Sequence, residues 1–335
     1  MRGKALVTGG NGFIGSHLVD HLLKNGHAVR ALVRKTSELR WLSGRKIELM
    51  YGDLFDVDAL RRAVTGVQFV YHLAGVTKAK TAEGYIRANT TGTVNLLEAV
   101  RANNTHLRRF VHISSQTASG PSPTRVPITE DAPPHPITTY GWSKLRSEEA
   151  CARFFRNFPV TIIRLPAVFG PRDKDIYEFF RTMDNGLQPM VGFREKYISL
   201  VHVGDVVRGL VMAAGCPEAA GETYFLSSKE SYGWREVGDV VRRVMEKNVL
   251  RIHVPEFGVY AIAAVGELIA KFSRKPALIN FEKARDMVQD NWTCSSAKAK
   301  RDFGYEQEIS LEEGIRDAVA WYRMEGWLKE RPIEN

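Results

Sequence analysis

A glycine-rich turn near the N-terminus constrains the fold more than any other feature of the sequence. It follows an apolar run at 4–8 and precedes a run at 14–24 with apolar residues at helical spacing. Between a strand and a helix, the glycines permit a tight turn, a close approach of backbone to a pyrophosphate, and close helix packing. We therefore predict a dinucleotide-binding loop, with a ligand-free tight turn as the alternative; its binding residues are Gly9, Gly12, Phe13, Ile14 and Gly15.

Short apolar runs alternate with amphipathic stretches through the first half of the chain. Strands are expected at 4–8, 28–33, 47–51, 67–72, 110–114 and 159–164, with helices at 14–24, 57–64, 91–103 and 140–157. This alternation predicts a parallel sheet with right-handed crossovers on both faces. We therefore expect the α/β class, a Rossmann-type doubly wound parallel sheet with a smaller, interleaved C-terminal substrate domain.

Prolines interrupt the pattern after about residue 165. We expect an NAD(P)-binding Rossmann domain over 1–165, with a return near 203–228, and a mainly substrate-binding region over 166–335. Later helices are expected at 175–185, 203–214, 234–247, 254–272 and 311–325.

Composition excludes several classes of protein. The 335 residues are 44% hydrophobic and 25% charged, as in ordinary globular chains, and the net charge of +9 includes no long basic run of the kind that binds nucleic acid. Three widely spaced cysteines, at 151, 216 and 294, indicate a reducing compartment. The chain enters a strand at once and leaves no room for a signal peptide, so we expect a cytoplasmic protein. We also expect no metal site.

One apolar stretch raises the question of membrane contact. Residues 257–266 lie between Glu256 and Glu267, and a bilayer span needs roughly 20 apolar residues. A helix over 257–272, with Lys271, Arg274 and Lys275 near its end, would rest on a membrane surface or pack over the substrate cleft. We favour packing over membrane contact.

The end of the second strand indicates the choice of cofactor. NAD-binding versions of this fold place an acid there to hold the ribose hydroxyls, and here the position is Val33, followed by Arg34. No carboxylate repels a 2′-phosphate, and a guanidinium is placed to bind one. We expect NADP to be favoured over NAD; the alternative is that Arg34, beside Lys35, is a solvated surface charge.

A hydroxyl, a phenol and an ammonium group form the candidate catalytic set. Tyr140 and Lys144 stand at i and i+4 on a predicted helix, and the strand before it ends in Ser114 and Ser115. A free tyrosine has a pKa of about 10, and a nearby cation favours its phenolate form. We therefore predict Tyr140 as the acid/base, Lys144 as its electrostatic support and Ser115 as the donor that orients the substrate oxygen.

These features resemble the extended short-chain dehydrogenase/reductase superfamily, also called the NAD-dependent epimerase/dehydratase family, over nearly the whole chain. The resemblance implies that Asp53 and Leu54 contact adenine, that 72–75 is the motif after the fourth strand, and that Asn89 is structural and near the site. The elements Arg164–Arg172 and His202–Val207 match two later motifs. The implied further cofactor contacts are Leu73, Ala74, Gly75, Asn89, Ser114, Tyr140, Lys144, Pro166 and Val168.

Departures from the family pattern narrow the subgroup. Gln116-Thr117 stands where 4,6-dehydratases carry Asp-Glu, so dehydration of that kind is not expected. Ile198 and Ser199 replace the Arg-Asp with which many nucleotide-sugar epimerases hold a diphosphate. The strand end at 32–34, the apolar helix after 254 and the run 298–305 look more like dihydroflavonol-reductase-like and 3β-hydroxysteroid-dehydrogenase-like members.

Three functions follow from this reasoning. The first is an NAD(P)-dependent oxidoreductase that moves a hydride to or from a secondary alcohol or ketone carbon of a sugar-like or hydrophobic substrate. The second is a nucleotide-sugar epimerase without net redox change, and the third a non-catalytic dinucleotide sensor. Substrate contacts are expected from loops, at Thr77, Gln116 and Arg172. The resemblance also implies a homodimer, formed through the helices at 91–103 and 140–157.

Overall fold

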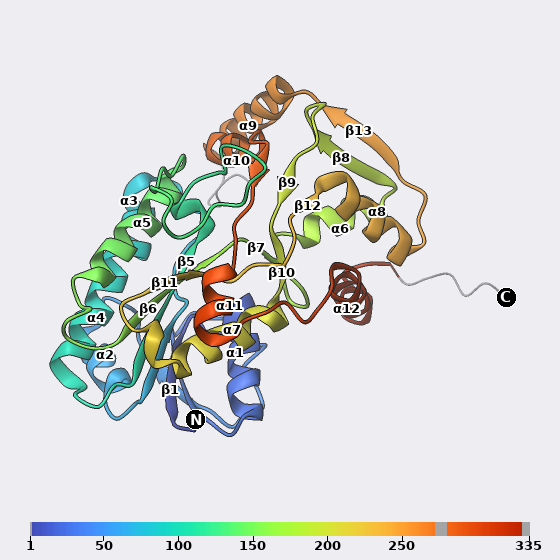
Figure 1. The fold of residues 1–335 in the computed structure, drawn as a ribbon. Coiled ribbons are helices and arrows are strands. Elements are labelled where there is room, and N and C mark those ends of the chain that lie inside the picture. The colour runs from blue at the N-terminus through green and yellow to red at the C-terminus, as the bar shows by residue number, and fades with distance from the viewer. Residues whose placement is uncertain (1, 272–279, 330–335) are drawn as a thin grey trace.

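A seven-stranded parallel sheet organises the molecule (Figure 1). The computed structural model describes residues 2–271 and 280–329. The strand order β11-β6-β5-β4-β1-β2-β3 runs outward from β1 in both directions, which is the doubly wound arrangement expected from the sequence. The strands are β1 (Lys4–Thr8), β2 (Ala28–Val33), β3 (Glu48–Tyr51), β4 (Phe69–His72), β5 (Arg109–Ser115), β6 (Val160–Leu165) and β11 (Thr223–Phe225).

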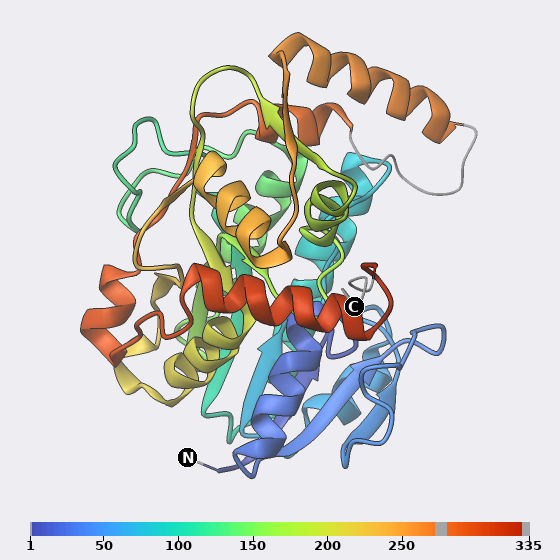
Figure 2. The same cartoon turned by 90° about the vertical axis from the view of Figure 1, so that its right-hand side faces the viewer.

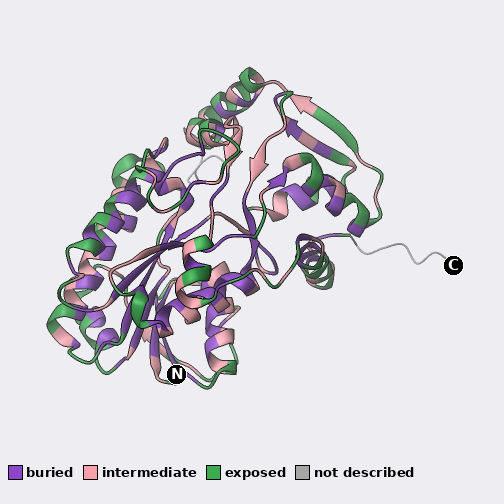
Figure 3. Ribbon diagram, in the orientation of Figure 1, coloured by how far each residue is buried: buried purple, intermediate pink, exposed green. Residues whose placement is uncertain are grey.

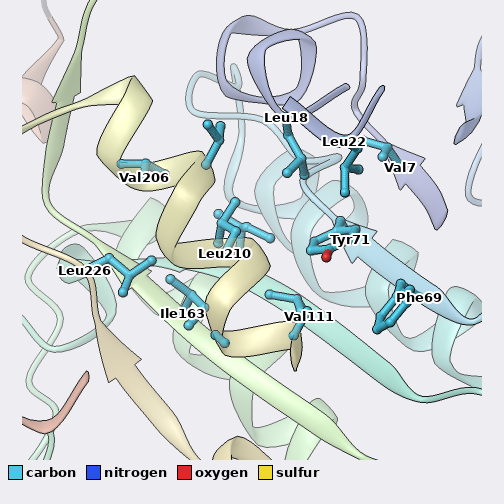
Figure 4. Close-up of a cluster of buried hydrophobic side chains, with 14 of the residues drawn as sticks. Val7, Leu18, Leu22, Phe69, Tyr71, Val111, Ile163, Val206, Leu210 and Leu226 are labelled. Atoms are coloured by element: carbon cyan, nitrogen blue, oxygen red, sulfur yellow. The ribbon is translucent and has the colours of Figure 1, made fainter. Parts of the chain in front are cut away.

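Helices cover both faces of this sheet. On one face lie α1 (Phe13–Lys24) and α7 (Val203–Gly215), and on the other α2 (Val57–Val64), α4 (Gly92–Asn103) and α5 (Thr139–Ala152). Successive residues of a strand point to opposite faces, so Val7 packs with the first pair of helices and Leu6 with the other three. Figure 4 shows Leu18 and Leu22 of α1 beside the sheet, and Leu210 of α7 in the same cluster.

After β6 the chain leaves the sheet and then returns to it. It forms β7 (Ala167–Phe169), α6 (Tyr177–Asp184), β8 (Leu187–Val191), β9 (Tyr197–Ile198) and β10 (Leu200–His202) before α7 and β11 come back. Strand β10 pairs in parallel with β7, and β11 pairs with β6. The division of the chain at residue 165 stays a prediction.

A smaller part stands beside the carboxyl ends of the large sheet. It adds β12 (Tyr232–Gly233), α8 (Trp234–Met245), β13 (Leu250–Val254), α9 (Glu256–Lys271), α10 (Phe281–Met287), β14 (Asn291–Trp292) and α12 (Leu311–Met324). Between β14 and α12, the helix α11 (Ala297–Phe303) packs instead against β11 and α7 of the large sheet. Helices α6, α8 and α12 share one core around Phe180, Val241 and Tyr322. In Figure 2, α12 crosses the middle of the molecule, and Figure 3 shows the buried faces of these helices turned inward.

The apolar helix expected after residue 254 is α9. Of the residues that the sequence placed at its basic end, Phe272, Arg274 and Lys275 lie outside the described residues. Within 2–271 and 280–329, no helix combines the length and the apolar character needed to cross a bilayer.

A buried ion pair anchors α5 on the sheet. The Glu148 carboxylate accepts two hydrogen bonds from Arg164 Nε, at 3.1 and 3.2 Å, and one from Nη2 at 2.7 Å. The Ser114 hydroxyl also donates to this carboxylate. The side chains of Glu148 and Arg164 are only 6% and 8% exposed, so neither charge is solvated without the other.

Removing one partner of this pair should destabilise the protein strongly. Glu148→Ala leaves the Arg164 charge buried and unpaired, and we expect the free energy of unfolding to fall by about 3–5 kcal/mol. Urea denaturation measures this fall. The matched control is Glu149→Ala, one residue along the same helix at an exposed position, which should change the free energy by less than about 0.5 kcal/mol. Equal effects of the two variants would contradict an anchoring role.

Candidate active site

Three of the four glycines of the first loop differ in their surroundings. Gly9 has φ +72°, and a Cβ there would lie 2.8 Å from Ala74 N. A Cβ on Gly15 would lie 2.1 Å from Gly9 O, so this glycine lets α1 pack against the loop. A Cβ on Gly12 would meet only Gly9 O, at 3.3 Å, and otherwise open space. The loop therefore has one turn glycine, one packing glycine and one with an open side.

The start of α1 has the features of an anion-binding site. Gly12 is its N-cap, no side chain caps the helix, and its first turn carries no acid. Phe13 and Ile14 are half-buried there. The amides of this turn, together with the helix dipole, are the groups that bind phosphate. This uncapped turn and the open side of Gly12 fit the pyrophosphate of a dinucleotide.

The end of β2 places its two residues differently. Val33 is 2% exposed and packs in the core, so an acid at this position would be buried among apolar side chains. Arg34 is exposed; its backbone N–H donates to Ser37 Oγ at 3.2 Å. Arg34 is thus the residue here that reaches solvent. Further along this edge, Asp53 is exposed and accepts from Phe55 N–H at 2.7 Å, and half-buried Leu54 touches α4.

Asn89 ties the loop after β4 to α5. Its Oδ1 accepts from Val76 N–H at 2.8 Å, and its Nδ2 donates to Val76 O at 3.0 Å and to Ser143 Oγ at 2.9 Å. It lies in a π-helical turn, η1 (Ile86–Thr91). A Cβ on Gly75 would lie 2.8 Å from Asn89 Oδ1, which explains the small residue. These bonds fit the structural role that the resemblance implied.

The same loop is also tied to β1. Leu73 N–H donates to Thr8 O at 3.1 Å, and Ala74 N–H donates to Thr8 Oγ1 at 3.3 Å. Thr8 Oγ1 is also hydrogen-bonded to His72 Nδ1, at 2.7 Å. Leu73 to Gly75 therefore lie directly beside the glycine loop, where the strand order diverges from β1.

Ser115 and Tyr140 meet at the end of β5. The Ser115 hydroxyl lies close enough to the Tyr140 phenol to act on its pKa, and Ser115 Oγ accepts from the Thr117 hydroxyl at 2.9 Å. Thr138 caps α5 by accepting from Gly141 N–H at 3.1 Å. A Cβ on Gly141 would lie 2.4 Å from Thr117 O, so α5 begins in tight contact with the turn η2 (Gln116–Ala118). This contact holds the tyrosine against the serine.

The protonation of this set is governed by burial. Burial raises the pKa of Tyr140 to about 12, although its hydrogen bond with Ser115 acts in the opposite direction. Burial lowers the pKa of Lys144 to about 8, against the effect of the nearby Glu148 charge. Lys144 Nζ donates to Ile113 O at 2.6 Å. Near neutral pH, therefore, Tyr140 is a neutral phenol and Lys144 is mostly an ammonium.

Two residues beside Ser115 differ in their freedom to bind a ligand. The Ser114 hydroxyl is buried and donates to Glu148, so it is used inside the protein. Gln116 is only 3% exposed, and no described residue hydrogen-bonds its Nε2. A buried amide donor without a partner is costly. Gln116 therefore has a donor available next to Ser115.

The other expected contacts are more scattered. Pro166 and Val168 are half-buried just beyond β6, Val168 opposite Val201 in β10. Thr77 is exposed, and its carbonyl accepts from Tyr85 at 3.4 Å. Arg172 is held on α1: it donates to Ser16 Oγ at 3.1 Å and to Asp20 Oδ2 at 2.8 Å. The structure does not bring the Arg172 guanidinium to the Ser115–Tyr140 pair.

Sequence reasoning missed the contribution of α10. Glu282 accepts from the Thr139 backbone N–H and, at 3.2 Å, from its hydroxyl, so α10 sits on the start of α5. Asp286 is near enough to raise the pKa of Tyr140. Burial raises the pKa of Asp286 itself to about 6, and no described residue hydrogen-bonds its Oδ1. No local motif marks these carboxylates, because only the tertiary fold brings them to Tyr140.

Known proteins with similar sequences cover nearly the whole chain. The ceramide reductase of Caulobacter vibrioides is 29% identical over 327 residues, covering 98% of this chain and 96% of its own length. The 2-alkyl-3-oxoalkanoate reductase of Stenotrophomonas maltophilia is 27% identical over 329 residues, covering 93% and 97%.

A solved structure shows the same fold. The UDP-glucuronic acid 4-epimerase from Bacillus cereus, in complex with NAD, superposes with a TM-score of 0.78 at 22% identity, over 96% of this chain and 99% of that one. At this identity the likeness concerns the fold alone. The family model described as NAD dependent epimerase/dehydratase family matches residues 5–227. With its glycine loop and its Ser115–Tyr140 pair at one edge of the sheet, this chain is an enzyme that belongs to the NAD-dependent epimerase/dehydratase family.

Proposed function

We propose that this protein is an NADP-preferring reductase that converts a ketone on a lipophilic substrate into a secondary alcohol. The observation that carries the proposal is the position of Ser115 and Tyr140 beside each other at the sheet edge that also holds the glycine loop. Lys144 stands one helical turn beyond Tyr140. The bound nicotinamide cofactor supplies the hydride.

The protonation state of Tyr140 favours the direction of reduction. With its pKa raised to about 12, the phenol carries a proton that it can give to the substrate oxygen as that oxygen gains negative charge. Ser115 orients this oxygen by a second hydrogen bond. The Lys144 ammonium stabilises the phenolate that remains after proton transfer. Oxidation of an alcohol would instead need the phenolate at the start.

Two features support a lipophilic ketone over a nucleotide sugar. Ile198 lies in β9, and the Ser199 side chain is buried and accepts from Cys294 N–H at 3.0 Å, so neither offers a charge to a diphosphate. The similar ceramide and 2-alkyl-3-oxoalkanoate reductases are named for lipid-like compounds. The Gln116 amide does not distinguish the two classes, because it would hold a polar group of either substrate close to the reacting carbon.

Net cofactor turnover separates this proposal from the two alternatives. A reductase consumes one NADPH for each ketone reduced, whereas an epimerase returns its hydride and a dinucleotide sensor turns over nothing. Long-chain β-ketones and ketosteroids are the first substrates to test, with nucleotide sugars as the comparison set. A ligand of the folded protein also raises its melting temperature in the presence of cofactor, which selects the candidates.

The setting of the enzyme is also part of the proposal. We propose that it works in the cytoplasm, where its three free, buried cysteines stay reduced. We propose further that it forms a homodimer through α4 and α5, the helices that the resemblance indicates. On α5 the exposed Trp142 would be part of that contact.

Removing the phenol should stop the reaction and leave cofactor binding intact. Tyr140→Phe takes away the proton donor, so kcat should fall by a factor of about 100 to 10,000, with little change in the Kd for NADPH. The control is Tyr177→Phe, which removes a hydroxyl bonded to Trp327 O in the smaller part of the molecule. Turnover of Tyr140→Phe within a few-fold of wild type would show that another group is the acid.

Two glycines of the loop should respond differently to substitution. Gly12→Val fills the open side where a pyrophosphate must approach, so calorimetric titration should show loss of NADPH binding in a folded protein. Gly15→Ala places a Cβ 2.1 Å from Gly9 O, so it should lower the urea midpoint. A folded Gly12→Val protein with wild-type affinity would contradict phosphate binding by the loop.

Arg34 should determine the preference for the 2′-phosphate. Arg34→Gln removes a charge-assisted contact, so the Kd for NADPH should rise about tenfold to a hundredfold while the Kd for NADH stays constant. Lys35→Gln, at the next exposed position, is the matched control. Both constants are measured at one fixed low salt concentration. Tighter binding of NADH than of NADPH by wild type would overturn the proposed preference.

A further inference from the structure

Helix α9 turns an entirely apolar face to solvent. At 100° per residue, its outward half contains the half-buried Gly258 and seven other residues: Phe257, Ala261, Ile262, Ala264, Val265, Leu268 and Ile269. All seven are exposed, and the five large ones are 49–77% exposed. A surface helix ordinarily presents charged or polar residues on this side. In Figure 2, α9 lies along the upper edge of the molecule.

The side of α9 that faces the protein carries the polar side chains Tyr260 and Glu267 beside its apolar contacts. Val259 and Ala263 pack against Ala284 of α10, and the Tyr260 ring stacks on Phe281 at 6.4 Å. Glu267 Oε1 accepts from the Phe281 backbone N–H at 3.1 Å. The usual amphipathic arrangement is therefore reversed relative to the protein body.

A loop with an exposed aromatic ring and an exposed guanidinium adjoins the start of α9. Phe193 is exposed and stacks on His253 with ring centroids 5.4 Å apart. The next side chain, Arg194, is 86% exposed and lies 3.8 Å from the Asp290 carboxylate. Both residues line a shallow hollow together with Pro255 and Glu256. An aromatic ring and a guanidinium are thus added to the apolar surface at this end.

We propose that the outward face of α9 docks on an anionic lipid membrane and lies in the plane of its surface. A helix of 16 residues is about 24 Å long, too short to span but well suited to lie in the interface. The net charge of +9 and the exposed Arg194 attract the chain to anionic lipid headgroups.

A second copy of the chain is the less suitable occupant. Stable protein interfaces involve about 20–30 residues on each side, whereas this face has seven. A membrane needs no matching shape, because its attraction grows with the apolar area that leaves water.

The position of α9 connects the proposed docking with the candidate active site. Helix α10 packs against α9 on one side and, through Glu282, holds the start of α5 on the other. The membrane contact would thus lie one helix away from Tyr140 and would present a lipid-borne ketone to the cleft. Only this step rests on the proposed function; the docking itself does not.

Vesicle flotation of the full-length protein tests the docking. Wild type should float with vesicles of equal parts phosphatidylcholine and phosphatidylglycerol, and less with phosphatidylcholine alone. The double variant V265E/I269E places two carboxylates on the outward face, and its partition coefficient should fall at least about tenfold. The control is Val57→Glu, a valine at the start of α2 that is 76% exposed, against 58% for Val265; this variant should float as wild type does.

Two readouts keep the outcomes distinct. Turnover of a water-soluble ketone should be equal in wild type and V265E/I269E, because neither residue touches the site. Wild type that does not float would overturn the proposal. So would a double variant that changes from dimer to monomer in size-exclusion chromatography while floating normally, since a second copy would then cover α9. Vesicle binding by a protein that reduces no ketone would overturn the proposed function and leave the docking intact.

Discussion

The site depends on how α5 is seated on the sheet. Glu148, buried with Arg164 of β6 and Ser114 of β5, fixes the helix on two strands at once. Tyr140, Lys144 and Glu148 follow one another at intervals of four residues, so they share one face of the helix. Moving the helix away from β6 would leave one of these charges buried without its partner, which is strongly unfavourable. That arrangement also determines where the phenol and the ammonium point.

The buried surroundings of the Glu148–Arg164 pair also extend to Tyr140 and Lys144 and determine their pKa values. Burial moves the pKa of Tyr140 up to about 12 and that of Lys144 down to about 8, so the two values move apart and each group favours its neutral form more than it would in water. The result is a neutral proton donor with a cation one turn away, which is suited to a substrate oxygen that becomes negative. Asp286 increases this effect from the smaller part of the molecule, because its charge disfavours a phenolate.

Local sequence patterns predicted those parts of the fold that depend on the residues close to them in sequence. The period of apolar residues revealed the alternation of strands and helices, and the doubly wound sheet that it predicted is confirmed. The helical period likewise brings Tyr140 and Lys144 to one face of α5. Strands of two or three residues, such as β9 and β10, have no period to detect. Position alone could not show that Val33 is buried or that Arg172 pairs with Asp20 on α1. Asp286 and the outward face of α9 needed the tertiary fold, because nothing near them in sequence marks their role.

Isotope transfer tests the central claim most directly. The protein is incubated with a long-chain β-ketone and NADPH that carries deuterium at the transferable position of the nicotinamide, and the product is analysed by mass spectrometry. Direct reduction at this site predicts an alcohol with one deuterium at the carbinol carbon and one NADPH oxidised for each alcohol formed. An unlabelled product, or a sugar epimerised without consumption of cofactor, would contradict the account.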